Sequence, residues 1–298
     1  WITPTGRAGG VPPPAACCWP PFSLSEKIVD QIRAITKKLA LACGIRGLLN
    51  IQYAVRDEHV FVIELNPRAS RTVPFSSKAT GVSLAKYASR IMAGEKISEL
   101  RAQGLLPDEN RTVDYYAVKE AVMPWSRFPG ADSILGPEMK STGEVMGIAR
   151  TFPAAYAKTR EAVENKLPEQ GSVFISVCDR DKRAIAPVAM ALENLGYGIY
   201  TTGGTAKTLR AAGIDCTTVN RISDGHPNVV DLMRDKTVSF IINTPHGHEA
   251  HSDGTKMRAE AVSQGITCVT AMSAATALIQ ALAAARKSEP ETFALQDL

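Results

Sequence analysis

The pattern of apolar and polar positions is most regular in the last part of the chain, after residue 171. Short apolar runs alternate there with segments in which apolar residues recur at helical spacing. The runs predict strands at 173–178, 198–201, 216–219, 238–242 and 267–269. Helices are predicted after each strand, at 182–195, 205–211, 228–234, 255–264 and 273–285. This alternation predicts an α/β fold with a doubly wound parallel sheet.

The first ordered pattern begins near residue 23, where Ser23 and Glu26 have the spacing of a capping box. The apolar positions that follow lie on one helical stripe: Ile28, Ile32, Ile35 and Leu39. Gly44 stands where this predicted helix should end. A second, short helix is predicted at 84–92, closed by Gly94.

Between these helices lie two β-rich runs, 48–55 and 60–65, separated by the polar segment 56–59. This pattern predicts a β-hairpin. If 57–59 form a three-residue loop, Gln52 pairs with Glu64. A loop of two or four residues would instead place Ile63 opposite Gln52, because a one-residue slip exchanges the two faces of a strand. We expect the first register.

Two segments show neither helical nor strand periodicity. The first 22 residues contain six of the 18 prolines, and we expect them to lie outside any packed domain. Further prolines cut the stretch from 97 to 166 into short pieces typical of connecting structure. The chain therefore divides into a Pro-rich lead-in, a first unit, a connecting region and a second unit: 1–22, 23–98, 99–165 and 166–298.

Composition narrows the class of protein. With 298 residues and 45% hydrophobic content, the chain can bury a substantial core. It has no apolar stretch long enough for a membrane span and no signal-peptide pattern, so we expect a cytoplasmic protein without a membrane partner. A net charge of +4 argues against a nucleic-acid polymer as partner. Six cysteines without a CxxC pair argue against a disulfide framework and against a zinc site.

Acid, amide and guanidinium groups gather where the second β-rich run ends. Strand alternation places Glu64 and Asn66 on one face, and the expected register adds Gln52. Oxygen donors of this kind suit Mg²⁺ or Mn²⁺. Arg68 and Arg71 could then hold phosphoryl oxygens. From the residues alone, a structural ion pair between Glu64 and Arg68 is an equally open alternative.

Two turns in the α/β part have the composition of a phosphate site. One is the segment 179–182, which includes Lys182, and the other is the Thr-Thr-Gly-Gly-Thr segment 201–205. Gly203 and Gly204 let the backbone approach an anion, and the following helix offers its N-terminal amides. The alternative is a tight turn in which Thr205 merely caps the helix.

Three histidines fall within the segment 245–253, and His248 and His251 are spaced by one helical turn. This spacing is compatible with a metal site. We favour an exposed loop with incidental histidines, because no further soft ligands stand nearby.

Several strings resemble, in chain order, those of the large chain of carbamoyl phosphate synthase. They are NIQYAV, VIELNPRASRTVPFSSKATGVSLAK, FPGADSILGPEMKSTGEVMGIA and the final α/β block, and together they run from about Pro20 to the end. The resemblance implies that the first unit is the C-terminal part of the second ATP-grasp unit, an α+β fold that phosphorylates carbamate with ATP. It implies that the second unit is a methylglyoxal-synthase-like domain that binds UMP or IMP as an allosteric effector.

The resemblance also assigns roles to residues. It makes Gln52, Glu64 and Asn66 ligands of Mg²⁺ or Mn²⁺, and it places Arg68 and Arg71 at the phosphate or the reacting carbamoyl group. The effector positions that it implies are Lys182, Thr202, Thr205, Arg221, Asn243 and Thr244, with Gly203 and Gly204 in the cradle. Arg221 replaces a lysine found in many relatives. The acidic motif of a methylglyoxal-forming lyase is absent.

A large chain of this family carries two ATP-grasp units, so we expect this chain to be a C-terminal fragment. The Pro-rich lead-in departs from the family, and a shifted reading frame or gene start would explain it. The implied reaction uses glutamine or ammonia, bicarbonate and two ATP, and it supplies arginine and pyrimidine synthesis. The implied partners are the glutaminase small chain, the N-terminal part of the large chain and further copies in an oligomer. The alternative is a non-catalytic, nucleotide-binding regulatory module.

Overall fold

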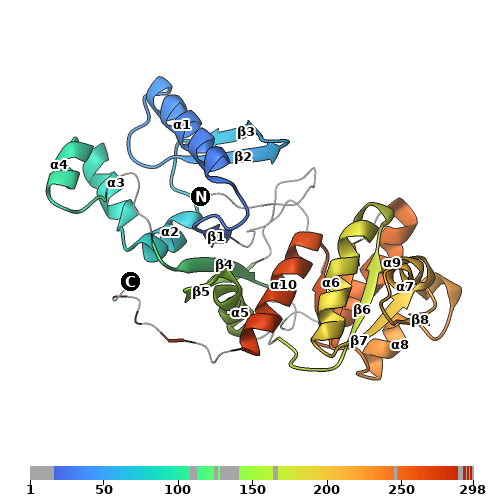
Figure 1. Ribbon diagram of the computed structural model, residues 1–298. Helices are drawn as coiled ribbons and strands as arrows, with labels where there is room; N and C mark the ends of the chain where they lie inside the picture. The colour runs from blue at the N-terminus through green and yellow to red at the C-terminus, as the bar shows by residue number, and fades with distance from the viewer. Residues whose placement is uncertain are drawn as a thin grey trace.

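The computed structural model describes residues 17–107, 113–123, 127, 141–163, 167–244, 247–287, 291, 292, 294 and 296, with only the backbone of 247–252 (Figure 1). Residues 1–16 of the lead-in and the LGPEMK part of the third family string lie outside the described residues. The described residues form a mixed α/β fold with three separate sheets. None of the described helices is long and apolar enough to span a membrane.

The expected connecting region contributes two strands to a three-stranded antiparallel sheet with the order β1-β4-β5, and β1 comes from the lead-in. The strands of this sheet are β1 (Cys17–Trp19), β4 (Tyr116–Val122) and β5 (Gly143–Ala149), and α5 (Phe152–Ala162) packs on it. The prediction of mere connecting structure is therefore wrong. Its strands were missed because β4 and β5 are separated by a long interval of the chain, so that no local hairpin signal marks them.

β1 also corrects the prediction that the lead-in lies outside any packed domain. Cys17 pairs with Lys119 and Cys18 with Val118 in the β1–β4 ladder, and both cysteines are buried. Burial raises the pKa of the Cys18 thiol to about 12. A strand of three residues has too few positions to show periodicity, and the flanking prolines mask it further.

The helices of the first unit are α1 (Glu26–Ala42), α2 (Thr72–Thr80), α3 (Leu84–Met92) and α4 (Ile97–Ala102). The stripe predicted for α1 is confirmed, because Ile28 and Ile32 are buried. The predicted capping box is wrong: Ser25, not Ser23, is the N-cap. Gly44 follows the end of α1 with a φ of +61°, which favours glycine.

The hairpin consists of β2 (Asn50–Arg56) and β3 (His59–Asn66). The predicted pairing of Gln52 with Glu64 is confirmed, but the three-residue loop is wrong. The loop has two residues, Asp57 and Glu58, both with positive φ as a type I′ turn requires. A bulge at Ile63, between Gln52/Glu64 and the next pair, adds the residue that restores the expected register.

The second unit is a five-stranded parallel sheet with the order β10-β9-β6-β7-β8. Its strands are β6 (Ser172–Val177), β7 (Gly198–Thr202), β8 (Thr217–Val219), β9 (Phe240–Thr244) and β10 (Thr267–Val269). Its helices are α6 (Lys182–Asn194), α7 (Gly203–Ala211), α8 (Val229–Arg234), α9 (Gly247–Ser263) and α10 (Met272–Ala285). The doubly wound prediction is confirmed. The loop predicted at 245–253 is wrong from Gly247 onward, where the backbone is already helical.

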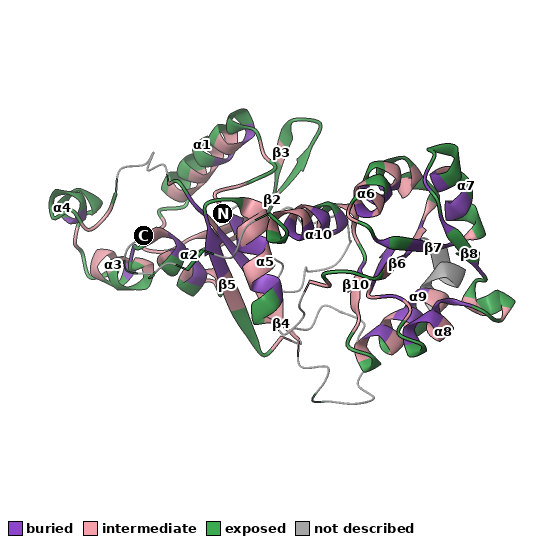
Figure 2. Ribbon diagram, turned by 60° about the horizontal axis from the view of Figure 1, so that its bottom comes forward, coloured by how far each residue is buried: buried purple, intermediate pink, exposed green. Residues whose placement is uncertain are grey.

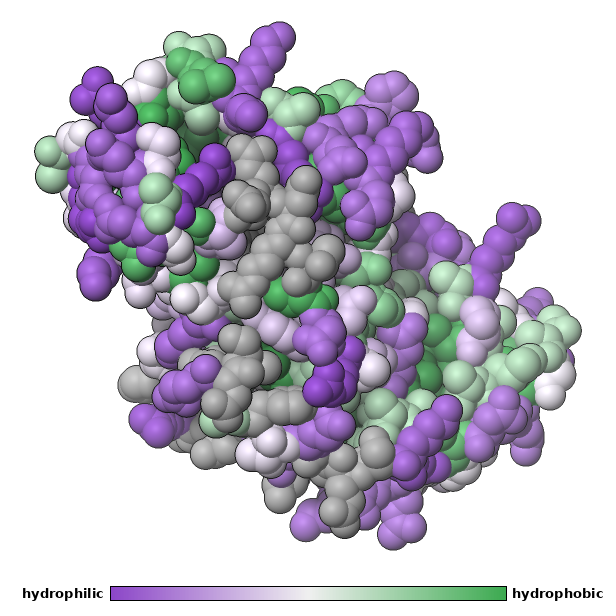
Figure 3. All heavy atoms as spheres, turned by 60° about the vertical axis from the view of Figure 1, so that its left-hand side comes forward, coloured by the Kyte–Doolittle hydropathy of each residue, from purple (hydrophilic) through white to green (hydrophobic). Residues whose placement is uncertain are grey.

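Buried residues gather along the β1-β4-β5 sheet and the five-stranded sheet and on α5 and α10, whereas the β2–β3 hairpin has none (Figure 2). On one face of the parallel sheet, Ile175 and Ile242 belong to a core that also includes Val118 and Ala155 of the antiparallel region. On the other face, Phe174 and the α8 and α9 side chains form a second core. The two regions therefore share one hydrophobic core through α5 and α10. The face shown in Figure 3 is mostly hydrophilic, with separate hydrophobic areas.

Candidate functional sites

One face of the hairpin carries the predicted oxygen donors. Gln52 pairs with Glu64, and Asn66 donates its Nδ2 to Glu64 Oε1 over 2.9 Å. The hydroxyls of Thr36 and Tyr53 lie 2.7 Å apart, so α1 packs against the opposite face. The three predicted metal ligands therefore share the face that α1 leaves open.

Asn50 adds a fourth polar side chain that the sequence reasoning missed. It pairs with Asn66 in the ladder and stands two residues before Gln52, so it belongs to the same face. Extending the alternation back along the predicted strand would have found it. The open face thus presents one carboxylate and three amides at the end of the hairpin away from its turn.

The chemistry of this set fits a hard divalent cation. Asn66 uses its amide nitrogen toward Glu64, which leaves its Oδ1 available, and Glu64 Oε2 has no partner among the described residues. Carboxylate and amide oxygens are ligands that Mg²⁺ and Mn²⁺ accept. The ion pair between Glu64 and Arg68 does not form in the described structure, because Arg68 donates to the Ala69 carbonyl over 3.0 Å.

The two predicted phosphate-binding arginines lie on the segment that joins β3 to α2. Both side chains are exposed, and Arg71 is the N-cap residue of α2. Within the described structure neither guanidinium pairs with Glu64. The segment therefore places two guanidiniums close in sequence to the oxygen donors, and in the described structure neither guanidinium neutralises the Glu64 carboxylate.

The second site lies at the carboxyl edge of the parallel sheet, where two turns meet. Lys182 follows the 3₁₀ turn η2 (Asp179–Asp181), and its Nζ lies 3.8 Å from the place where a Cβ on Gly204 would be. The amine of the first turn therefore lies over the glycine of the second. Strand ends of this kind are where open α/β sheets bind ligands.

α7 begins two residues earlier than predicted. Thr202 is its N-cap residue without a side-chain capping bond, and Gly203 is its first residue. The alternative in which Thr205 caps the helix is therefore wrong. The Thr205 hydroxyl is buried and accepts the Val177 N–H over 3.2 Å, so it ties α7 to β6.

A short polar row crosses three neighbouring strands at this edge. Ser176 Oγ lies 3.2 Å from Thr202 Oγ1, and Ser176 pairs with Asn243 in the β6–β9 ladder. Asn243 donates its Nδ2 to the Ser176 carbonyl over 3.0 Å. Its Oδ1 is buried and has no partner among the described residues. An orphaned buried acceptor is costly, and a ligand donor would satisfy it.

The remaining predicted effector residues have other positions. Thr244 is buried on the opposite face of β9, and its hydroxyl accepts the Cys178 N–H over 3.2 Å. Arg221 is exposed and precedes the 3₁₀ turn η3 (Ile222–Asp224) after β8. The described structure shows no contact between Arg221 and the other predicted effector residues. Sequence reasoning missed Ser176, which only the strand register brings into the row.

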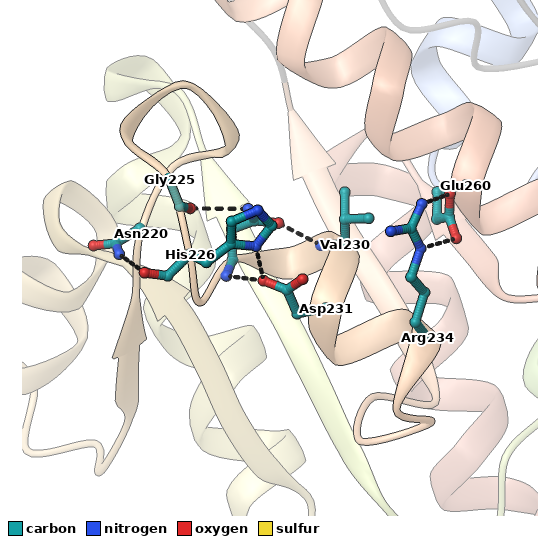
Figure 4. Close-up of polar contacts among 8 residues, drawn as sticks. Asn220, Gly225, His226, Val230, Asp231, Arg234 and Glu260 are labelled. Carbon is teal, nitrogen blue, oxygen red and sulfur yellow. Dashed lines mark hydrogen bonds and ion pairs between the residues drawn. The ribbon is translucent and has the colours of Figure 1, made fainter.

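A cavity of about 480 Å³ lies between η3, α8 and α9. Three of its lining side chains take part in two ion pairs (Figure 4): His226 Nδ1 lies 2.7 Å from Asp231 Oδ2, and Arg234 Nε lies 3.0 Å from Glu260 Oε1. These partners hold the pKa of Asp231 and that of Glu260 below their usual values. Asn228 and Asp231 together make the capping box of α8, so this cluster stabilises the helix.

The histidine-rich segment adds no metal site to the described structure. Pro245, His246 and the side chains of His248 and His251 lie outside the described residues. Elsewhere in the described part, no group of three His, Cys, Asp or Glu side chains could hold a metal ion. All six cysteines are free, and burial raises the pKa of Cys268 to about 11.

Two family models match the chain. The model described as "Carbamoyl-phosphate synthase L chain, ATP binding domain" matches residues 18–100, and that described as "MGS-like domain" matches residues 184–270. A solved methylglyoxal synthase from Elizabethkingia anophelis is 18% identical with a TM-score of 0.33, covering 38% of this chain and 79% of its own.

Relatives named carbamoyl phosphate synthase large chain match nearly the whole chain. Those of Acidobacterium capsulatum and Pseudomonas putida are 45% and 46% identical, over 95% of this chain and 26% of their own length. A relative in Aquifex aeolicus, named the C-terminal section of that large chain, is 43% identical over 91% of this chain and 53% of its own. The chain thus spans about a quarter of the full-length relatives and about half of the Aquifex section.

Proposed function

Because the chain belongs to the family of carbamoyl phosphate synthase large chains, we propose that it carries part of the site that phosphorylates carbamate with ATP, followed by a nucleotide-binding regulatory domain. The observation that carries the first part is the single hairpin face shared by Gln52, Glu64 and Asn66. These residues would hold Mg²⁺ or Mn²⁺.

Phosphoryl transfer requires positioning and charge neutralisation more than proton transfer by the protein. A bound divalent cation would supply charge compensation for the phosphate oxygens. In the proposed site Glu64 offers a carboxylate oxygen to the cation, and Arg68 and Arg71 grip anionic oxygens of ATP or carbamate through charge-assisted hydrogen bonds. No residue of this face is needed as a general base.

The regulatory part of the proposal concerns the carboxyl edge of the parallel sheet. Lys182 and the α7 N-terminus would bind the phosphate of a nucleotide such as UMP or IMP, because both are suited to an anion. The orphaned Asn243 Oδ1 supports this assignment, since a hydroxyl or N–H of the nucleotide would satisfy it. Thr202, beside Ser176, belongs to the set that we propose for the effector, whereas Thr244 and Arg221 lie apart from it in this structure and stay predictions of the family resemblance.

In the complete enzyme, this chain would act with the rest of the large chain and with a glutaminase small chain, in a cytoplasmic oligomer that serves arginine and pyrimidine synthesis. A second candidate is a regulatory module without turnover. The position of Lys182 Nζ over the Gly203–Gly204 turn favours this regulatory module for the isolated chain.

Two assays on the isolated chain distinguish these candidates. The enzyme predicts Mg²⁺-dependent release of phosphate from ATP that rises when carbamate is present. The module predicts a UMP-dependent rise in the unfolding temperature without phosphate release, because a ligand that binds only the native state stabilises it. Absence of both responses would contradict both candidates.

A further inference from the structure

One guanidinium joins the antiparallel region to the parallel sheet. Arg160, on α5, donates its Nη1 to Glu120 Oε1 of β4 and its Nη2 to Thr267 Oγ1 of β10, the latter over 3.4 Å. The side chains of Arg160 and Glu120 are only 10% and 19% exposed. Removing one partner of such a buried ion pair leaves an uncompensated charge, so each depends on the other. We call these three residues the junction.

The ion pair of the junction is incompletely bonded. Glu120 Oε2 and Arg160 Nε are buried and have no partner among the described residues. One is an acceptor and the other a donor of the same ion pair. A guanidinium released from Thr267 can turn and hold Glu120 through two parallel bonds, with Nε and Nη2 as its donors. Arg160 therefore has two arrangements, shared with Thr267 or closed on Glu120, and each satisfies groups that the other leaves unpaired.

β4 lies between the junction and the first unit. Alternate residues of β4 point to opposite faces, and Glu120 faces α5. On the other face, Ala117 belongs to a core that it shares with Phe75 of α2, and Lys119 Nζ lies 6.0 Å from the centre of the Phe75 ring. α2 begins directly after Arg71, one of the proposed phosphate-binding residues. A change at Glu120 therefore reaches the helix that Arg71 caps through a single strand.

β10 lies beside the strand that carries the orphaned acceptor of the proposed effector site. Val269 of β10 pairs with Ile242 of β9, and Asn243 is the next residue of β9. A nucleotide bound at the cradle formed by Lys182 and the Gly203–Gly204 turn would contact Asn243 and hold β9 in place. Through the ladder it would also hold β10, which carries Thr267.

We propose that Arg160 couples the ligand state of the parallel sheet to β4. A ligand that steadies β9 and β10 raises the population of the shared arrangement, whereas loosening of β10 lets Arg160 close on Glu120. The two arrangements form the two-state element that such coupling requires. This inference rests on the proposed effector site, and it adds the residue that transmits its occupancy to the first unit.

The first test needs no ligand. If Thr267 and Glu120 compete for one guanidinium, removing the Thr267 hydroxyl gives Glu120 its second bond. Glu120→Gln should then lower the folding equilibrium constant by at least about threefold more in a Thr267→Val background than in the wild type. Urea unfolding of the four proteins measures this difference. Equal costs in the two backgrounds would overturn the competition at the junction.

Thr217→Val is the matched control background, because Thr217 begins β8, the opposite edge strand of the same sheet, as Thr267 begins β10. Glu120→Gln should cost the same in this background as in the wild type. A larger cost in both threonine variants would overturn the proposal, since it would show a general weakening of the sheet.

The second test is hydrogen exchange of the full chain with and without UMP. In the wild type and in Thr217→Val, UMP should slow the exchange of amides in both β10 and β4 by at least about fivefold. In Thr267→Val, β10 should keep this response and β4 should lose it. A β4 response that persists in Thr267→Val would overturn the coupling and leave the effector site standing. If the wild type does not bind UMP, the effector site is wrong and the coupling falls with it.

Discussion

The two candidate sites rest on different kinds of support. The hairpin has only two strands, and Phe61, Val62 and Ile63 are exposed on it. The proposed phosphate site stands on a sheet that is buried on both faces, with Phe174 fully enclosed on one face and Ile175 on the other. Two-stranded hairpins are marginal by themselves, whereas a covered parallel sheet supplies its own core.

The two sites therefore differ in what holds their side chains in place. At the hairpin, the ladder register alone decides that Gln52 and Glu64 meet. At the cradle, turns anchored to buried strands hold Lys182 over Gly204, and buried hydroxyls tie α7 and β9 to β6. We therefore expect the cradle to hold its geometry in the isolated chain more firmly than the hairpin face does.

The largest expected effect is on stability. Phe174→Ala removes a side chain with no exposed surface from the middle of the parallel sheet, and we expect a loss of about 3–5 kcal/mol in the free energy of unfolding. Phe61→Ala, on the hairpin, should change it by less than about 0.5 kcal/mol, because that side chain is 53% exposed. Urea unfolding followed by circular dichroism measures both. Equal losses would show that the hairpin is as integral to the core as the sheet.

The next effect is on ligand binding, and it tests whether the sites are separate. Glu64→Gln should weaken Mn²⁺ binding by about tenfold or more, because it removes the carboxylate of the hairpin face, and should leave UMP affinity unchanged. Lys182→Ala should do the reverse. Electron paramagnetic resonance of Mn²⁺ and calorimetry with UMP provide the two readouts. A variant that lost both ligands equally would contradict the division.

The smallest effect concerns acid stability at the start of α8. His226 and the Asn228 N–H lower the folded-state pKa of Asp231, so its contribution is present above the unfolded pKa and is lost as pH falls through the lowered folded value. Asp231→Asn should therefore lower the unfolding temperature at pH 6, and the difference from wild type should shrink toward pH 3. Thermal scans across that range measure it. A difference that stayed constant with pH would show that the carboxylate charge is irrelevant to the α8 cap.

The sequence by itself determined the parallel α/β unit, the hairpin and the pairing of Gln52 with Glu64. Apolar runs, helical stripes and strand alternation are local signals, and in this chain they agree with the tertiary packing. The family resemblance added the roles that we propose for these residues. The right pairing nevertheless came from the wrong loop, because a two-residue turn and a bulge at Ile63 compensate each other.

Only the tertiary structure decided which long-range neighbours meet. β1 enters a sheet because β4, a hundred residues away in the chain, offers it a free edge, and no local pattern records that. Likewise, Ser176 joins Thr202 and Asn243 through the register of three strands, and Asp179 reaches Lys182 through the shape of one turn. Periodicity reports whether a segment will be buried, but the partner that buries it is chosen by the packing of the whole chain.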